Sequence, residues 1–143
     1  MNLKILSKED VSIILGLYQT DFSDGWNKEQ LISSFDSGYF LCIGAFIEDE
    51  LVGVITATKS FEDADIEGIV TKNQFRNRGI ASTLMNRLIE ELSKSKVKNI
   101  FLEVRESNSV AIALYKKFNF KLISQRKKYY SNGENALIFK REE

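Results

Sequence analysis

The sequence predicts an α/β fold in which helices pack against a mixed sheet. Segments of alternating or β-branched apolar residues are interleaved with segments of helical period, in the order β-α-α-β-β-β-α-β-α-β-β. The 143 residues are 43% hydrophobic and 28% charged, which is an ordinary balance for a soluble protein that can bury a core without disulfides. We therefore expect one domain that spans residues 1–143.

The expected elements follow from apolar runs and the polar residues that interrupt them. The strands are expected at Leu3–Leu6, Tyr39–Ile47, Leu51–Thr58, Ile66–Thr71, Ile100–Arg105, Phe120–Lys127 and Ala136–Lys140. The helices are expected at residues 7–18, 27–36, 79–94 and 109–118.

Caps and periodicity support the individual elements. Ser7 and Asn27 are favourable N-cap residues, and Gly38 is a suitable helix stop. The helix from Gly79 carries an apolar residue every fourth position, at Ile80, Leu84, Leu88 and Leu92. In the strand that begins at Ile100, alternation places Glu103 on the face opposite the apolar side chains of Ile100, Leu102 and Val104.

The composition excludes several kinds of chemistry. Cys42 is the only cysteine and lies in an apolar run, so we expect a buried, inert thiol and no disulfide. There is no histidine, so we expect no metal site and no Ser-His or Cys-His catalytic pair. Lys plus Arg and Asp plus Glu both number 20, which predicts no overall attraction to nucleic acid or to anionic membranes. The short, charged N-terminus and the lack of a long apolar stretch lead us to expect a cytoplasmic protein.

One turn is suited to a phosphate group. Residues 76–81, Arg-Asn-Arg-Gly-Ile-Ala, lie between a strand and the long helix, where unpaired N–H groups and the helix dipole favour an anion. Gly79 allows close approach of the backbone to a ligand. The spacing is neither G-x-G-x-x-G nor the Walker pattern, which disfavours an oxidoreductase or an NTPase. An ordinary loop with two solvated arginines remains the alternative.

These residues resemble a known family. Arg76-x-x-Gly79-x-Ala81 resembles the pyrophosphate-binding signature of GNAT acetyltransferases, [Q/R]-x-x-G-x-[G/A]. Residues 102–120 resemble the family segment L-x-V-x-x-x-N-x-x-A-x-x-L-Y-x-x-x-G-F, with Asn119 in place of glycine. The resemblance runs from about Leu51 to the end of the chain. It implies a mixed, mostly antiparallel central sheet flanked by helices on both faces.

Within that family, residues 102–105, 126–130 and 133–137 look most like bacterial ribosomal-protein-alanine N-acetyltransferases. The resemblance implies transfer of acetyl from acetyl-CoA to the N-terminal α-amine of a ribosomal protein. The expected partner is thus a protein N-terminal peptide, and the enzyme would be a monomer or a homodimer without direct contact to nucleic acid or membrane.

The resemblance also assigns residues to the donor. Backbone groups of Ile69, Val70 and Thr71 would lie along the pantetheine arm, with the Val70 N–H at the thioester oxygen, and Asn108 would lie near the pantetheine. The pyrophosphate would be surrounded by Asn77, Arg78, Gly79, Ile80, Ala81 and Ser82.

Three side chains are candidates for proton transfer. Glu103 matches the general base and Tyr115 the general acid, while Glu67 on a neighbouring strand is a rival base. A solvated Glu103 and a purely core Tyr115 are the structural alternatives. An α-amine has a reference pKa of about 7.7–8.0 against about 10.4 for lysine, so a modest base suffices.

The acceptor side resembles the family less closely. Residues 22–27 resemble an F-P-W-S-type loop, but Gly25 replaces proline, and Trp26 could equally be a core anchor. Tyr129 and Tyr130 match paired tyrosines on the opposite wall. The basic run 126–128 could attract an acidic peptide or the CoA phosphates, or form a solvated edge strand. A small-molecule amine acetyltransferase and a non-catalytic acetyl-CoA-binding module are the alternative functions.

Overall fold

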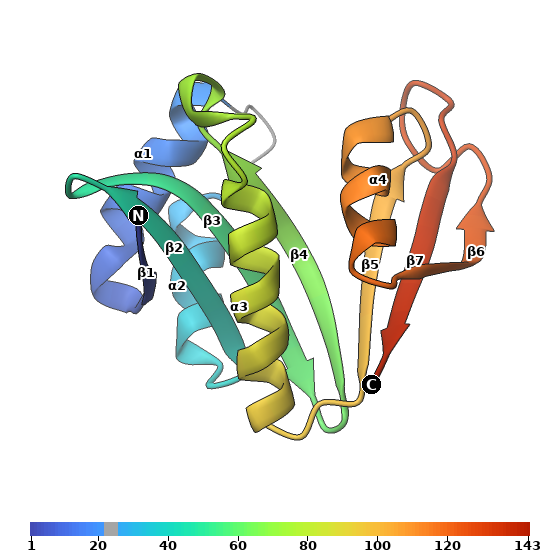
Figure 1. The fold of residues 1–143 in the computed structure, drawn as a ribbon, viewed down its shortest axis with the longest axis horizontal. Coiled ribbons are helices and arrows are strands. Elements are labelled where there is room, and N and C mark those ends of the chain that lie inside the picture. The colour runs from blue at the N-terminus through green and yellow to red at the C-terminus, as the bar shows by residue number, and fades with distance from the viewer. Residues whose placement is uncertain (22–25) are drawn as a thin grey trace.

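The computed structural model describes residues 1–21 and 26–143, which form a seven-stranded sheet with helices on both faces (Figure 1). The strands are β1 Asn2–Ile5, β2 Phe40–Ile47, β3 Glu50–Ser60, β4 Asp63–Thr71, β5 Asn99–Arg105, β6 Lys121–Arg126 and β7 Ala136–Glu142. The helices are α1 Val11–Asp21, α2 Lys28–Asp36, α3 Ile80–Lys94 and α4 Ser109–Lys117, with short 3₁₀ turns at Lys8–Asp10 and Asn73–Phe75.

The sheet has the order β1-β2-β3-β4-β5-β7-β6. Its strands pair antiparallel except for β4 and β5, which pair parallel. A parallel pair needs a crossover, and α3 supplies it. The predicted mixed, mostly antiparallel sheet is confirmed.

Most local predictions hold, because they depend on neighbouring residues. Asn27 Oδ1 accepts a hydrogen bond from Gln30 N at 2.8 Å, and Gly38 ends its helix at φ 81°. Asn119, which stands where the family segment has glycine, adopts a positive φ of 69°. The helix expected at residues 7–18 differs, since it divides into a 3₁₀ turn and α1. Strand β4 begins at Asp63, before the expected Ile66, because the tight turn at Phe61 already pairs Ser60 with Asp63.

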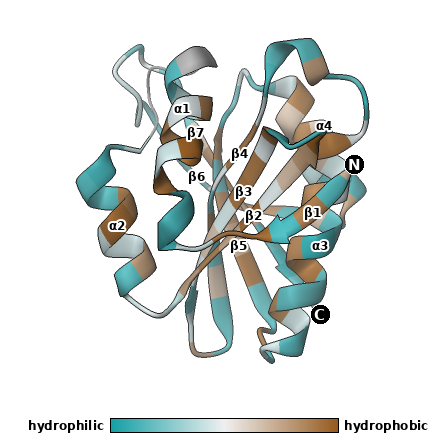
Figure 2. Ribbon diagram, turned by 90° about the vertical axis from the view of Figure 1, so that its left-hand side faces the viewer, coloured by the Kyte–Doolittle hydropathy of each residue, from teal (hydrophilic) through white to brown (hydrophobic). Residues whose placement is uncertain are grey.

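The core lies on both faces of the sheet. Leu84, Leu88 and Leu92 of α3 pack with the sheet on one face, while Ile14 of α1 and Leu31 of α2 belong to a second buried cluster. In Figure 2 brown segments gather where helices and strands meet, and teal segments face outward. The Cys42 side chain is buried, as predicted. Among the described residues, no helix has the length and apolar character that a membrane span requires.

Candidate functional site

Strands β4 and β5 separate partway along their length. They pair from Asp63 opposite Asn99 to Ile66 opposite Leu102, and the pairing then stops although both strands continue. In Figure 1 the two strands diverge toward the top of the view. The predicted donor residues Ile69, Val70 and Thr71 lie in this unpaired part of β4, where only the edge toward β3 is hydrogen-bonded. The other edge therefore offers backbone groups to a ligand.

A β-bulge marks the start of the separation. Thr56 of β3 lies opposite Gly68 and Ala57 opposite Ile66, so Glu67 has no partner in the register. Bulges bend a strand and redirect its side chains. Glu67 directly follows the last β4 residue that pairs with β5, and Glu103 directly follows the last β5 residue. The two rival carboxylates thus lie on either side of the point where the strands part.

The carboxylates differ in their contacts. Glu67 Oε1 accepts a hydrogen bond from Thr58 Oγ1 at 2.5 Å. Glu103 Oε1 lies 3.8 Å from Arg126 Nε. Glu103 is exposed while Leu102 and Val104 are buried, which confirms the predicted alternation of β5.

The predicted phosphate turn, residues 76–81, leads into a first turn of α3 whose amides are free. Gly79 is the N-cap of α3 with φ 77°, and its carbonyl accepts Thr83 N at 3.0 Å and Thr83 Oγ1 at 2.9 Å. Within residues 1–21 and 26–143, the amides of Ile80, Ala81 and Ser82 donate to no protein acceptor. A Cβ at Gly79 would meet nothing within 4 Å. The start of α3 is therefore open to an anion, and binding of the pyrophosphate there stays a prediction.

Basic side chains lie at this turn, one within the turn itself and one from α4. The Arg78 guanidinium lies 5.0 Å from the centre of the Phe75 ring, and Asn77 adopts a positive φ of 64°. Lys117 of α4 donates from Nζ to Ser82 Oγ at 3.3 Å. Sequence reasoning missed Lys117, because only the fold brings the end of α4 to the first turn of α3.

The net charge is zero, but the basic and acidic residues are distributed unevenly along the chain. Residues 1–70 contain four Lys or Arg and 13 Asp or Glu, whereas residues 71–143 contain 16 and seven. The basic part includes the phosphate turn, α3 and α4. Its local field favours a polyanionic ligand even though the whole chain is neutral.

Asn108 is the N-cap of α4. Its Oδ1 accepts Ala111 N at 3.1 Å, so the side-chain carbonyl is engaged in capping the helix. The predicted contact of Asn108 with the donor stays a prediction.

Tyr115 is a core residue, with a side chain 6% exposed. Its ring lies 6.0 Å from that of Phe120 and 6.4 Å from that of Phe139. Burial raises the pKa of Tyr115 to about 12. The phenol is therefore neutral at physiological pH and retains a proton that it can donate.

This burial predicts a loss of stability at high pH. The pKa of Tyr115 rises from 10.0 to about 12 on folding, so its stabilisation is complete below pH 10 and is lost as pH rises toward 12. Urea unfolding between pH 7 and about pH 11 should show a steeper alkaline decline in the free energy of unfolding for the wild type than for Tyr115→Phe. Parallel declines would contradict the buried phenol.

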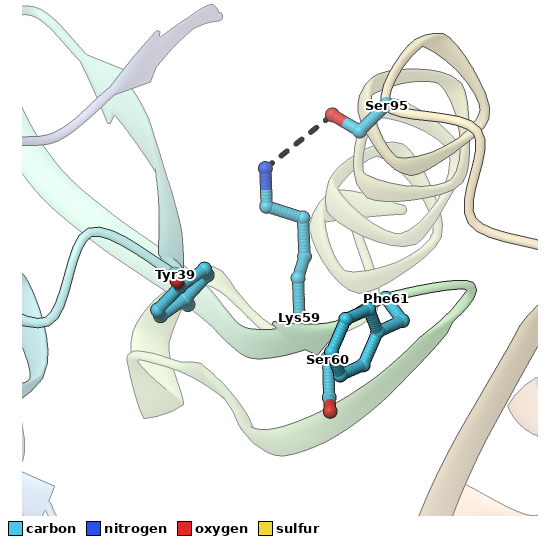
Figure 3. A pocket seen from close by; sticks show the side chains of 5 residues that line it. All are labelled: Tyr39, Lys59, Ser60, Phe61 and Ser95. Carbon is cyan, nitrogen blue, oxygen red and sulfur yellow. Dashed lines mark hydrogen bonds between the residues drawn. The ribbon is translucent and has the colours of Figure 1, made fainter.

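Part of the acceptor loop, residues 22–25, lies outside the described residues. Trp26 is half-buried, and its ring lies edge-on to Phe40 at 5.6 Å, which confirms the anchoring alternative for this side chain. A separate pocket is lined by Tyr39, Lys59, Ser60, Phe61 and Ser95 (Figure 3). It lies at the C-terminal end of α3, about 22 Å from the Gly79 end, so it is distinct from the phosphate turn.

The chain is similar in sequence to known proteins. The sequence model of the Acetyltransferase (GNAT) family matches residues 11–120. A Bacillus subtilis protein provisionally named [ribosomal protein bS18]-alanine N-acetyltransferase is 30% identical over 132 residues, covering 91% of this chain and 87% of that protein. An N-alpha-acetyltransferase from Saccharolobus solfataricus is 39% identical over 77 residues, 53% of this chain and 46% of its own.

Among solved structures, the crystal structure of the ribosomal-protein-S18-alanine N-acetyltransferase from Escherichia coli superposes with a TM-score of 0.91. It is 24% identical and covers 99% of this chain and 92% of its own. The superposition supports the shared fold.

Proposed function

The chain belongs to the Acetyltransferase (GNAT) family and is an N-acetyltransferase, and on this premise we propose that it acetylates the N-terminal α-amine of a ribosomal protein. The names of the Bacillus subtilis and Saccharolobus solfataricus relatives support an α-amine acceptor. The observations that carry the proposal are the pair of carboxylates at the separation of β4 and β5 and the open amides at the start of α3. We further propose that residues 1–143 act as one domain in the cytoplasm.

The residues where β4 and β5 separate, together with the start of α3, fit acetyl-CoA as the donor. The free amides of Ile80, Ala81 and Ser82 and the empty space at Gly79 match a diphosphate, and the unpaired edge of β4 matches the amide groups of a pantetheine arm. Acetyl-CoA supplies the acetyl group as a thioester. The residues proposed to hold it are Ile69, Val70, Thr71, Asn77, Arg78, Gly79, Ile80, Ala81, Ser82 and Asn108.

The protein's groups would divide the proton transfers. Glu103, directly or through one water, accepts the proton that the acceptor amine loses as its nitrogen bonds to the acetyl carbon. The register directs the Val70 N–H toward Val54 of β3, so a backbone N–H on the open edge of β4, from Ile69 or Thr71, would instead stabilise the charge on the carbonyl oxygen. As the carbon–sulfur bond breaks, Tyr115 protonates the departing thiolate. The proton on Glu103 then passes to solvent, and Tyr115 regains one.

Substitution of the two carboxylates separates the candidate bases. We expect Glu103→Gln to lower kcat about 100-fold at pH 7 because the amine loses its proton acceptor. Glu67→Gln keeps the hydrogen bond from Thr58 to a side-chain oxygen and should lower kcat less than about fivefold. Steady-state rates with an alanine-starting peptide test this. The reverse ranking would assign the base to Glu67.

Two adjacent lysines test the donor side. Lys117 contacts Ser82 in the first turn of α3, whereas Lys116 makes no ion pair in the described part of the chain. We expect Lys117→Met to raise the KM for acetyl-CoA about tenfold, and Lys116→Met to change it less than about twofold. Neither should alter the KM for S-acetylpantetheine, which lacks the diphosphate. Equal effects of the two variants would contradict the assignment.

The acceptor is tested by intact-mass measurement. With acetyl-CoA and peptides that reproduce ribosomal protein N-termini, we expect one added acetyl, located on the α-amine by fragmentation. Polyamines and aminoglycosides should gain none. Robust acetylation of those small amines alone would replace the proposal with a small-molecule acetyltransferase, and acetyl-CoA binding without any transfer would leave a non-catalytic module.

A further inference from the structure

The connection between β6 and β7, residues 127–135, is fastened to the end of β5. Glu134 Oε1 accepts Ser107 N at 3.2 Å, and Glu134 Oε2 accepts Asn132 Nδ2 at 2.7 Å. Asn135 Nδ2 donates to Glu106 Oε2 at 3.1 Å, and Asn135 Oδ1 accepts Lys128 N at 2.9 Å. These contacts hold the connection in one conformation before any substrate arrives.

Arg105 joins this connection to the strand that carries Glu103. It lies two residues along β5, on the same face as Glu103. Its guanidinium carbon lies 4.0 Å from the centre of the Tyr130 ring, and its Nη1 lies 3.5 Å from Glu134 Oε2. Arginine commonly pairs with a carboxylate while it stacks on an aromatic ring, and both contacts fix the position of the ring.

The remaining contacts return to Glu103. The Tyr130 and Tyr129 rings meet edge to face at 5.2 Å, and the Arg126 guanidinium lies 5.3 Å from the Tyr129 ring. Arg126 Nε in turn lies 3.8 Å from Glu103 Oε1. Burial raises the pKa of Tyr130, and the charge of Glu103 raises it further. The contacts thus form a continuous chain from Glu103 through Arg126, Tyr129 and Tyr130 to Arg105, which lies two residues from Glu103 on β5.

We propose that Arg105 and Glu134 are positioning residues for the acceptor. They hold the Tyr130 ring, which forms one wall of the acceptor site, in a fixed position relative to the Glu103 carboxylate. This inference rests on the proposed α-amine acetyltransfer and extends it to two residues outside the proton transfer. Hydrogen bonds from Ser107 and Asn132 lower the pKa of Glu134, so Glu134 remains charged at neutral pH.

The inference predicts a selective effect on the acceptor. Glu134→Gln keeps the size of the side chain but removes the charge that holds Arg105, so we expect the KM for the acceptor peptide to rise about five- to tenfold. The KM for acetyl-CoA and the melting temperature should stay near wild type. Arg105→Gln should reproduce this pattern, and Arg105→Lys, which retains the charge but not the flat guanidinium, should fall between it and the wild type.

The control removes a comparable carboxylate elsewhere. Glu142 Oε1 lies 3.0 Å from Lys140 Nζ on β7, and neither residue belongs to the chain of contacts between Glu103 and Arg105. Glu142→Gln should therefore leave both KM values unchanged. An unchanged acceptor KM in Glu134→Gln and Arg105→Gln would overturn the inference. So would a parallel loss of melting temperature, kcat and both substrate affinities, which would indicate general unfolding. If the wild type transfers no acetyl to α-amines, the proposed function fails first and separately.

Discussion

Replacement of Tyr115 by phenylalanine should lower kcat at least about 100-fold while leaving acetyl-CoA affinity nearly unchanged. The ring would remain packed between Phe120 and Phe139, because the substitution removes only the hydroxyl. What is lost is the neutral acid, whose raised pKa of about 12 keeps it protonated throughout the working range. Single-turnover rates and calorimetric titration of acetyl-CoA measure the two quantities separately.

A control and a contrary result define this test. Tyr39 is exposed and lies by the pocket at the other end of α3, so Tyr39→Phe should leave turnover unchanged. Equal losses of binding and turnover in Tyr115→Phe would show that the tyrosine serves the fold alone.

Replacement of Gly79 by valine should weaken acetyl-CoA binding about 100-fold, because it both strains the turn and fills it. At φ 77° a β-branched residue is strained, and its side chain would enter the open space beside the amides of Ile80 and Ala81. The loss in the free energy of acetyl-CoA binding should therefore exceed the loss in the free energy of unfolding. Calorimetry and thermal unfolding of the same samples check this.

Gly38 provides a matched control for the strain. It has a similar φ of 81°, and a Cβ at this position would also meet nothing within 4 Å, but Gly38 ends α2 far from the phosphate turn. Gly38→Val should lower stability by about 1–2 kcal/mol and leave acetyl-CoA affinity intact. If both variants bind acetyl-CoA as the wild type does, Gly79 has no role in donor binding.

Features governed by neighbouring residues could be predicted from the sequence. The Asn27 cap, the stop at Gly38 and the alternation that exposes Glu103 each depend on a few adjacent positions. The open backbone at the start of α3 was predictable for the same reason, because a glycine before an amphipathic helix defines both the free amides and the space around them.

Features governed by register and packing could not be predicted. Nothing in the sequence states that β4 and β5 stop pairing after Ile66, or that Glu67 lies at a bulge. The contact of Lys117 with Ser82 joins residues 35 positions apart, and that of Arg105 with Glu134 joins residues 29 apart. Side chains of this kind look like solvated surface charges until the fold brings them together.

The central claim is that the amides at the start of α3 hold the diphosphate of the donor, and amide chemical shifts test it most directly. When acetyl-CoA is titrated into ¹⁵N-labelled protein, the resonances of Ile80, Ala81 and Ser82 should move most and downfield, as amides that gain charged acceptors do. S-acetylpantetheine should leave them nearly unmoved. Saturable binding of acetyl-CoA that shifts other amides while these three stay in place would contradict the account.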